Sequence, residues 1–244
     1  MSETLAAADD HAPEAANNDR PGLIALDGSA ASGKSTIGRQ LAARLGYRFL
    51  DTGIMYRAIT WAALERGIDV HDAAGLTRLA ASIGMSVIVT DRRDPTQARI
   101  SIDGRDVTEH LRAPEVDENV SLVSRVAGVR EALVQRQRAI AEPGHIVVAG
   151  RDIGTVVLPD APLKVYLDAS PEERARRRYA DFVASGRPVT EDAILDDLRR
   201  RDQIDRERDV SPLRPADDAV KIDTDGLTQE QVLERVLRLI ERAK

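Results

Sequence analysis

The sequence predicts an α/β fold in which a parallel sheet of five strands carries helices on both faces. Two observations point to it. Short apolar runs alternate with helical segments along most of the chain, and a glycine-rich loop joins the first run to the first helix. Neighbouring parallel strands need a crossover connection, which a helix usually supplies, so this alternation favours a parallel sheet. We expect the crossovers to be right-handed.

Five apolar runs have the length and composition of buried strands. They are Leu23–Leu26, Phe49–Leu50, Ile146–Ala149, Leu163–Leu167 and Ala219–Ile222. The segments that separate and follow them have helical spacing. They are residues 34–45, 54–66, 114–141 with a break near Gly128, 171–185, 190–209 and 228–242. The last of these should pack by one face, because its apolar residues form a single stripe.

The alternation is interrupted between the second and third helical segments. Two strand-like segments, residues 85–89 and 98–102, flank a polar turn at 91–95, and a third short strand is expected at 105–107. This spacing predicts a small antiparallel sheet, which belongs to an inserted subdomain at about residues 71–125.

The composition limits the class of protein. The chain has 244 residues, no cysteine and a net charge of −6, which excludes disulfides and argues against a nucleic-acid-binding surface. No apolar run approaches the roughly 20 residues that cross a bilayer. Residues 1–20 are acidic and lack the apolar core of a signal peptide. We expect a disordered leader over residues 1–20, one folded domain over residues 21–244, and a cytoplasmic protein without membrane or nucleic-acid partners.

The most informative motif is Gly28–Ser35, which fits Gly-x4-Gly-Lys-[Ser/Thr] at every fixed position and is followed by Thr36. It lies between a strand-like run and a helix, which is the setting of a phosphate-binding loop. Its backbone N–H groups and the helix N-terminus attract an oxyanion. Lys34 is placed to reach the β- and γ-phosphates of a nucleotide, and the Ser35 hydroxyl to bind Mg²⁺. The alternative is a chance glycine turn before a helix.

Two further strands deliver polar residues to the same edge of the sheet, where open α/β sheets bind ligands. Asp51, Thr52 and Arg57 follow the second apolar run and suit contacts with a substrate hydroxyl or phosphate. A helix N-cap beside an exposed arginine explains them equally well. Arg151 and Asp152 follow the third run. They suit a phosphate and a base or hydroxyl, and the alternative is an ion pair that closes the loop.

Arginine-rich helical segments supply more positive charge. Residues 174–178 contain four arginines, which can clamp a polyphosphate from a lid, because guanidinium groups grip phosphate oxygens in pairs. Arg201, Asp205 and Arg208 recur at i, i+4 and i+7 and therefore share one helix face. The alternative for both segments is a solvated surface enriched in arginine by codon bias, since the chain has only four lysines.

In their order along the chain, these motifs resemble the bacterial cytidylate kinases of the nucleoside monophosphate kinase family. The segments that carry the resemblance are the Gly28–Thr36 loop, LDTGIMYR (50–57), DGRDVT (103–108), VREALVQRQR (129–138), GRDIGTVV (150–157), KVYLDASPEERARRR (164–178) and residues 202–212. They span the chain from about residue 22 to its C-terminus. The resemblance implies a P-loop NTPase-type sheet. It makes the 71–125 insertion the monophosphate-binding region and residues 171–190 a short lid.

The resemblance further implies transfer of the γ-phosphoryl group of ATP to CMP or dCMP, with Mg²⁺. The ATP site would comprise Gly28, Ser29, Ala30, Ala31, Ser32, Gly33, Lys34, Ser35 and Thr36, together with Arg177 of the lid. The CMP site would comprise Thr52, Arg57, Ser121, Arg130, Arg151, Asp152, Asp205 and Arg208. The residues that stabilise charge during transfer would be Lys34, Arg151, Arg177 and Arg208. Ser35 would bind the metal.

Within the CMP site, the resemblance assigns Arg57 and Arg151 to the phosphate, with Arg208 nearby, and Asp205 to the ribose. The sequence offers no general base, and a monophosphate acceptor needs none because its oxygen is already anionic at pH 7. In-line transfer instead needs two positioned nucleotides and positive charge around the transferred group.

The cytosine would be read by Ser121, Arg130 and Asp152, a set that complements its amine donor and its two acceptors, O2 and N3. Two positions depart from the family pattern. Ala31 stands where many members carry a further glycine. Thr52 stands where serine is frequent, and it keeps the hydroxyl.

Three other functions fit part of the pattern. A kinase for adenylate, thymidylate or shikimate fits the loop but not the cytosine-reading set. A GTPase-type switch needs an Asn-Lys-x-Asp run, which the sequence lacks. A nucleic-acid-dependent ATPase is disfavoured by the acidic balance and by only two Phe, four Tyr and one Trp. We expect a monomer whose partners are ATP and CMP or dCMP.

Overall fold

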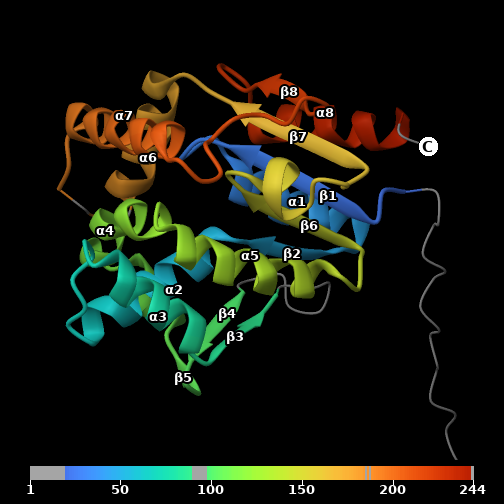
Figure 1. The fold of residues 1–244 in the computed structure, drawn as a ribbon. Coiled ribbons are helices and arrows are strands. Elements are labelled where there is room, and N and C mark those ends of the chain that lie inside the picture. The colour runs from blue at the N-terminus through green and yellow to red at the C-terminus, as the bar shows by residue number, and fades with distance from the viewer. Residues whose placement is uncertain (1–19, 90–97, 185, 187, 243–244) are drawn as a thin grey trace, which may run out of the picture.

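A computed structural model describes residues 20–89, 98–184, 186 and 188–242. Five parallel strands form its main sheet, in the order β2-β6-β1-β7-β8 (Figure 1). These strands are β1 (Leu23–Gly28), β2 (Arg48–Asp51), β6 (Ile146–Gly150), β7 (Leu163–Asp168) and β8 (Val220–Asp223). The predicted parallel five-stranded sheet is confirmed, and each strand lies within two residues of its predicted bounds.

The central strand β1 determines where the site forms. It pairs with β6 on one side and β7 on the other, with Ile24 opposite both Val147 and Leu163. The chain leaves β1 toward one edge of the sheet to form β2, and it leaves β7 toward the other edge to form β8. Connections that diverge in this way open a crevice at the carboxyl ends of the strands.

Helices cover both faces of this sheet because its strands are apolar on both sides. Ile24 and Leu26 of β1 belong to the core under α1 (Lys34–Leu45) and α8 (Gln229–Arg242). Ala25, which lies between them, belongs to the core under α2 (Gly53–Glu65) and α5 (Ala127–Ala141). This change of face at each residue is the period of two that a strand imposes.

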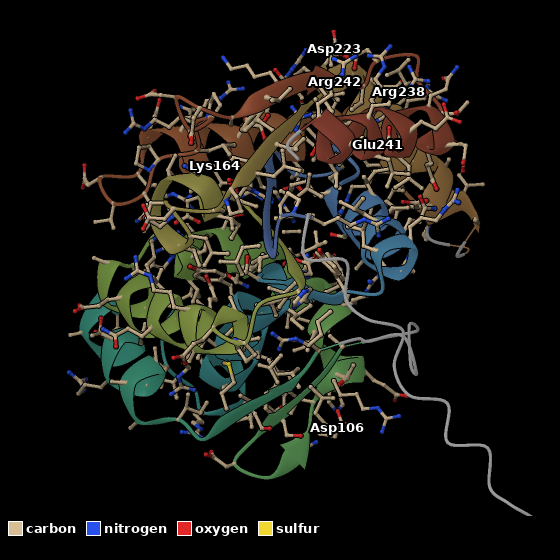
Figure 2. The ribbon with its side chains drawn as sticks, turned by 90° about the vertical axis from the view of Figure 1, so that its right-hand side faces the viewer. Asp106, Lys164, Asp223, Arg238, Glu241 and Arg242 are labelled. Carbon is tan, nitrogen blue, oxygen red and sulfur yellow. The ribbon has the colours of Figure 1, made fainter. Side chains whose placement is uncertain are left out.

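A second, antiparallel sheet confirms the predicted insertion of strands. Its strands are β3 (Met85–Ile88), β4 (Arg99–Ile102) and β5 (Arg105–Asp106), in the order β3-β4-β5. The predicted polar turn at 91–95 lies outside the described residues. Ile100 and Ile102 join the same hydrophobic core as α2, so the small sheet shares the core on one face of the main sheet. Figure 2 shows Asp106 of this sheet far from Arg238 and Arg242 of α8.

The helices around the small sheet were predicted less completely. Helix α3 (Ala73–Ser82) was missed; Leu76 and Leu79 are its only large apolar residues, and Asp72 caps it by accepting a hydrogen bond from Gly75 N at 2.9 Å. A 3₁₀ turn at Thr108–Arg112 leads into α4 (Pro114–Ser124). The predicted break in the long helix falls between Ser124 and Ala127, just before Gly128. A single π-helical turn, Ile153–Val157, follows β6 and was also missed.

Two further helices lie beside each other at one end of the molecule, α6 (Pro171–Ala184) and α7 (Glu191–Glu207), next to α4 (Figure 1). Ala175, Ile194 and Leu198 form a small core between them, which Ala30 of the glycine-rich loop joins. The predicted leader falls almost entirely on residues 1–19, outside the described part. Among the described helices, none combines the length and apolar character needed to cross a bilayer.

Candidate active site

The loop after β1 has the backbone of an anion-binding turn. Gly28 ends β1 with a φ of +150°, and a Cβ there would lie 2.2 Å from the main-chain oxygen of Leu167 in β7. Gly33 caps α1 with a φ of +94°, and its oxygen accepts from Ile37 N at 2.9 Å. Ala31 has a φ of +59°, which explains why a glycine suits this position. The predicted strand–loop–helix setting is confirmed.

Lys34 folds back over this loop. Its Nζ donates to the main-chain oxygen of Ser29 at 2.5 Å and to Ser32 Oγ at 3.3 Å. Burial lowers the pKa of Lys34 well below its ordinary value, and the nearby charge of Arg151 lowers it further. An anion bound in the loop would oppose both effects by favouring the ammonium form.

Ser35 and Asp51 place a hydroxyl and a carboxylate beside the loop. Ser35 Oγ donates to Asp51 Oδ2 at 2.5 Å, and Asp51 Oδ1 accepts from Gly53 N at 2.9 Å. A hydroxyl and a carboxylate are the ligands that Mg²⁺ takes from protein when phosphates supply others. Within the described residues, no group of three or more His, Asp or Glu side chains has the arrangement of a metal site. The residues present therefore fit a metal ion shared with a bound polyphosphate.

Asp27, near the end of β1, connects this strand to the loop after β6 by hydrogen bonds. It is buried, and its two carboxylate oxygens accept from the main-chain nitrogens of Ile153 and Gly154, both at 2.7 Å. Burial raises the pKa of Asp27 to about 6, although these two hydrogen bonds act in the opposite direction. Sequence reasoning missed this residue. The available signal was an acidic residue at the end of an otherwise apolar strand.

Arg130 and Asp152 form a buried ion pair at the end of β6. Arg130 comes from α5, where its side chain is 2% exposed, and its Nη2 pairs with Asp152 Oδ2. Its Nη1 donates to the main-chain oxygen of Ser124 at 3.1 Å, and its guanidinium lies 5.3 Å from the ring centroid of Tyr56. Ser121, from the adjacent helix α4, is also buried. The structure thus brings two of the three predicted cytosine-reading residues into direct contact.

Some polar atoms of this cluster have no hydrogen-bond partner among the described residues. They are Arg130 Nε and, farther along the rim, Arg208 Nη2. Burial raises the pKa of Tyr56 to about 12, so its hydroxyl stays protonated beside Gln137. Buried groups with spare donors are costly unless a ligand satisfies them. The spare donors indicate a polar ligand at this position.

Arg151 turns away from Asp152. Its Nε donates to Asp205 Oδ2 at 2.9 Å, and Asp205 Oδ1 lies 3.5 Å from Arg208 Nη1. The alternative of an ion pair between Arg151 and Asp152 is therefore wrong, because each of the two residues pairs with a different partner. Successive side chains of an extended segment project to opposite sides, so Asp152 faces α5 while Arg151 faces α7.

The residues at the end of β2 take different roles. Thr52 precedes α2 but does not cap it with its side chain; its Oγ1 donates to the main-chain oxygen of Ala149 in β6 at 3.0 Å. Arg57 is half-buried rather than exposed. It donates to the main-chain oxygen of Leu111 at 3.0 Å and pairs with Asp117 at 2.6 Å. The N-cap alternative with an exposed arginine is not what the structure shows.

The arginine-rich start of α6 is partly structural. Arg174 is 1% exposed; it donates to Asp202 at 2.5 and 3.1 Å and to the main-chain oxygen of Ala30 at 3.1 Å. It is therefore not a free clamp for polyphosphate, because burial and the Asp202 carboxylate hold it. Arg177 donates to Glu173 and to Thr224, the residue after β8. The structure does not place Arg177 beside the arginines predicted to contact the CMP phosphate.

The charged helix α7 was expected to be mostly solvated, and part of it is. Its exposed residues include Arg199, Arg200, Arg206 and Glu207. Its buried charged residues are Arg201, Asp202 and Asp205, with Arg208 directly after the helix. Buried charges on one face of a helix need partners. Here Asp202 pairs with Arg174 of α6 and Asp205 with Arg151 after β6, while Arg201 pairs with Asp197 of its own helix.

The fold and the glycine-rich loop define a phosphate-binding-loop protein of the α/β class, and buried ion pairs of Arg130 and Arg151 lie at the same edge of its sheet. A model of the family described as cytidylate kinase matches residues 24–242. The chain belongs to the cytidylate kinase family.

Curated relatives agree with this assignment. A cytidylate kinase from Bacillus licheniformis is 45% identical over 219 residues, which cover 90% of this chain and 96% of that protein. One from Herpetosiphon aurantiacus is 48% identical over 220 residues, covering 90% and 94%. Among solved structures, shikimate kinase from Acinetobacter baumannii in complex with shikimate has a TM-score of 0.47 and 19% identity, covering 92% of this chain and 95% of that one.

Proposed function

We propose that this protein is an ATP-dependent cytidylate kinase that phosphorylates CMP or dCMP. One observation carries the proposal. The phosphate-binding loop and Asp152, the partner of Arg130, follow the adjacent strands β1 and β6, and Asp27 of β1 accepts hydrogen bonds from Ile153 and Gly154 of the second loop. A donor phosphate and an acceptor nucleotide bound at these places would share one crevice.

Catalysis would depend on positioning and on positive charge. The loop and Lys34 would hold the β- and γ-phosphates of ATP, while Arg57, Arg151 and Arg208 would receive the acceptor phosphate. An ionised acceptor oxygen attacks in line, so no proton has to be removed and the arginines neutralise the charge that develops. Mg²⁺, held by Ser35 with Asp51, would supply further charge stabilisation on the ATP phosphates.

Base selection would fall to Asp152, Arg130 and Ser121. An ionised Asp152 accepts from the N4 amine of cytosine but faces lone pairs at O4 of uracil. Each mismatched buried group costs about 1–3 kcal/mol, so CMP should be preferred over UMP by about 10-fold to several hundred-fold in kcat/KM. Asp205 would bind the ribose.

The Asp152→Asn variant tests this assignment. An amide is able to donate to O4, so the variant should lose more activity with CMP than with UMP, and the CMP:UMP ratio should shrink. The measurement is kcat/KM for both nucleotides. An unchanged ratio would show that Asp152 serves only as the ion-pair partner of Arg130.

Two movable segments belong to the same proposal. Residues 71–125 would form the monophosphate-binding subdomain and residues 171–190 the lid, with Arg177 near the donor nucleotide. Closure over both nucleotides would exclude water from the transferred group. The proposal includes a monomeric enzyme in the cytoplasm.

A coupled assay with ATP and each of CMP, dCMP, UMP, AMP, GMP and dTMP tests the function. Turnover highest with CMP or dCMP supports the proposal. Higher turnover with another acceptor would replace it with that kinase activity, and ATP hydrolysis that responds only to nucleic acid would contradict it.

A further inference from the structure

Asp117 lies where helices from three parts of the chain meet. It occupies the first turn of α4, half-buried, and three arginines converge on it. Arg57 Nη2 of α2 is 2.6 Å from its Oδ1, and Arg178 Nη2 of α6 is 3.5 Å from its Oδ2. Arg201 Nη2 of α7 donates to its main-chain oxygen at 2.6 Å. Figure 1 shows α4 next to α6 and α7.

The charge of Asp117 matters to these arginines. Burial alone would raise the pKa of Asp117, but the charges of Arg57, Arg178 and Arg201 outweigh burial and lower it. Asp117 is therefore ionised at neutral pH. Among the described residues, it is the carboxylate that pairs with both Arg57 and Arg178. Without it, these two arginines would present two positive charges, which matches the charge of about −1.5 to −2 on a phosphate monoester.

Arg57 is also assigned to the acceptor phosphate in the proposed function, on which this inference rests. We propose that the Asp117 carboxylate takes the place of the acceptor phosphate in the nucleotide-free protein, so that CMP must displace it from Arg57 and Arg178. Asp117 then lowers the affinity for the acceptor while it keeps the arginines neutralised in the empty site. The exchange also removes the Arg178 contact that joins α6 to α4, whereas Arg201 of α7 keeps its hydrogen bond to the main-chain oxygen of Asp117.

The Asp117→Asn variant tests the exchange, because it keeps the shape and removes the charge. The dissociation constant for CMP, measured by calorimetry without ATP, should fall about three- to ten-fold, the range expected for a partly buried ion pair that no longer competes. The KM for ATP should stay unchanged. Inorganic phosphate, used as a competitor of CMP, should also bind more tightly. The matched control is Glu118→Gln on the same helix turn, where Glu118 is exposed; its effect on CMP binding should stay within two-fold.

Opposite results would overturn the inference. A weaker affinity for CMP in Asp117→Asn would mean that Asp117 positions the arginines for phosphate, and an unchanged affinity would mean that it does not compete. If thermal melting shows that the variant is unfolded, the test moves to the unaltered protein. The pKa of Asp117, measured there by carbon NMR, should rise when CMP binds. A constant or falling pKa overturns the inference. Failure of the unaltered enzyme to phosphorylate CMP would instead contradict the proposed function, while phosphate competition would still test the exchange.

Discussion

At the scale of single residues, the crevice is built from charges that are only partly neutralised by their neighbours. Lys34 contacts uncharged oxygens of its own loop, and Arg151 and Arg208 share one carboxylate, Asp205. Buried cations with uncharged or shared partners favour a bound anion, because the anion restores the lost solvation. This is the physical basis for the proposal that two phosphate groups bind at this edge of the sheet.

The Lys34→Ala variant tests the proposed binding of the ATP phosphates. Lys34→Ala should lower kcat by on the order of 10²-fold or more, the scale for removing one preorganised charge donor. The fold should survive. Lys221→Ala serves as the matched control, because Lys221 is exposed on the edge strand β8. Steady-state kinetics with ATP and CMP provides the measurement, and turnover near that of the unaltered enzyme would remove Lys34 from the mechanism.

The raised pKa of Asp27 predicts a pH-dependent stability. Its pKa is about 6 in the folded protein against 3.8 ordinarily, so between these values the folded state binds more protons than the unfolded state. The contribution of Asp27 to stability is therefore full below pH 3.8 and is lost as pH rises through 6. Between pH 4.5 and 7.5 the loss should be about 2 kcal/mol.

Urea unfolding of the unaltered protein and of Asp27→Asn at both pH values measures this loss. The stability of the unaltered protein relative to the variant should decrease as pH rises. A difference that is constant, or that increases with pH, would show that the hydrogen bonds from Ile153 and Gly154 offset the burial of the carboxylate.

At the scale of elements, one buried arginine connects the glycine-rich loop to the paired helices α6 and α7. Arg174 joins Ala30 of the loop to Asp202 of α7. Helices rich in charge and poor in apolar residues bury little surface, and Ala175, Ile194 and Leu198 form only a small core between them. The ion pair therefore holds a contact that apolar packing supports weakly.

Arg174 and Arg176 both lie on α6, so their variants compare the effect of a buried ion pair on stability with that of a surface ion pair. Arg174→Ala should destabilise the protein by about 3–5 kcal/mol, because it leaves the buried Asp202 carboxylate without its partner. Arg176→Ala removes an exposed arginine that pairs with Glu173 on the same helix and should change stability by no more than about 0.5 kcal/mol. Chemical denaturation compares the two, and equal effects would show that the Arg174–Asp202 pair does not hold α6 to α7.

At the scale of the whole molecule, the main sheet is the rigid part and two groups of helices flank its crevice. The first group is α3 and α4 with the small sheet, and the second is α6 with α7. The contact between α4 and the second group includes the bonds of Arg178 and Arg201 to Asp117. Polar contacts of this kind are exchanged more readily than a packed apolar core.

Closure of these segments predicts a change in hydrogen exchange. Amide exchange in α3–α4 and in α6–α7 should slow when ATP and CMP, or a bisubstrate analogue, are bound, because catalysis must exclude water from the phosphoryl group. Exchange in β1 and β6 should be slow with or without ligand, because both strands are buried on both faces. Mass spectrometry measures all segments in one experiment. Unchanged exchange in both groups would contradict the closure.

The sequence by itself determined the sheet, the loop and the edge at which the site forms. Apolar runs and the fixed glycines are local signals, and Gly28 in particular is required by its close approach to Leu167. The antiparallel insertion was also predicted from local signals, because two short strand-like segments flank a polar turn there. Helix α3 and the π turn after β6 escaped prediction. Only Leu76 and Leu79 are large apolar residues in the first, and the start of the second is bonded to the Asp27 carboxylate, which is distant in sequence.

Only the tertiary structure decided the partners of the charged residues. The sequence placed Arg151 beside Asp152, yet Arg151 pairs with Asp205 and Asp152 with Arg130. It grouped Arg174 with the arginines of a lid that can clamp polyphosphate, yet the fold buries Arg174 against Asp202. Asp27 and Asp117 carried no motif at all. Ion pairs join residues that are distant in sequence and form only where helices from separate segments converge, so spacing along the chain identifies the charges but not their partners.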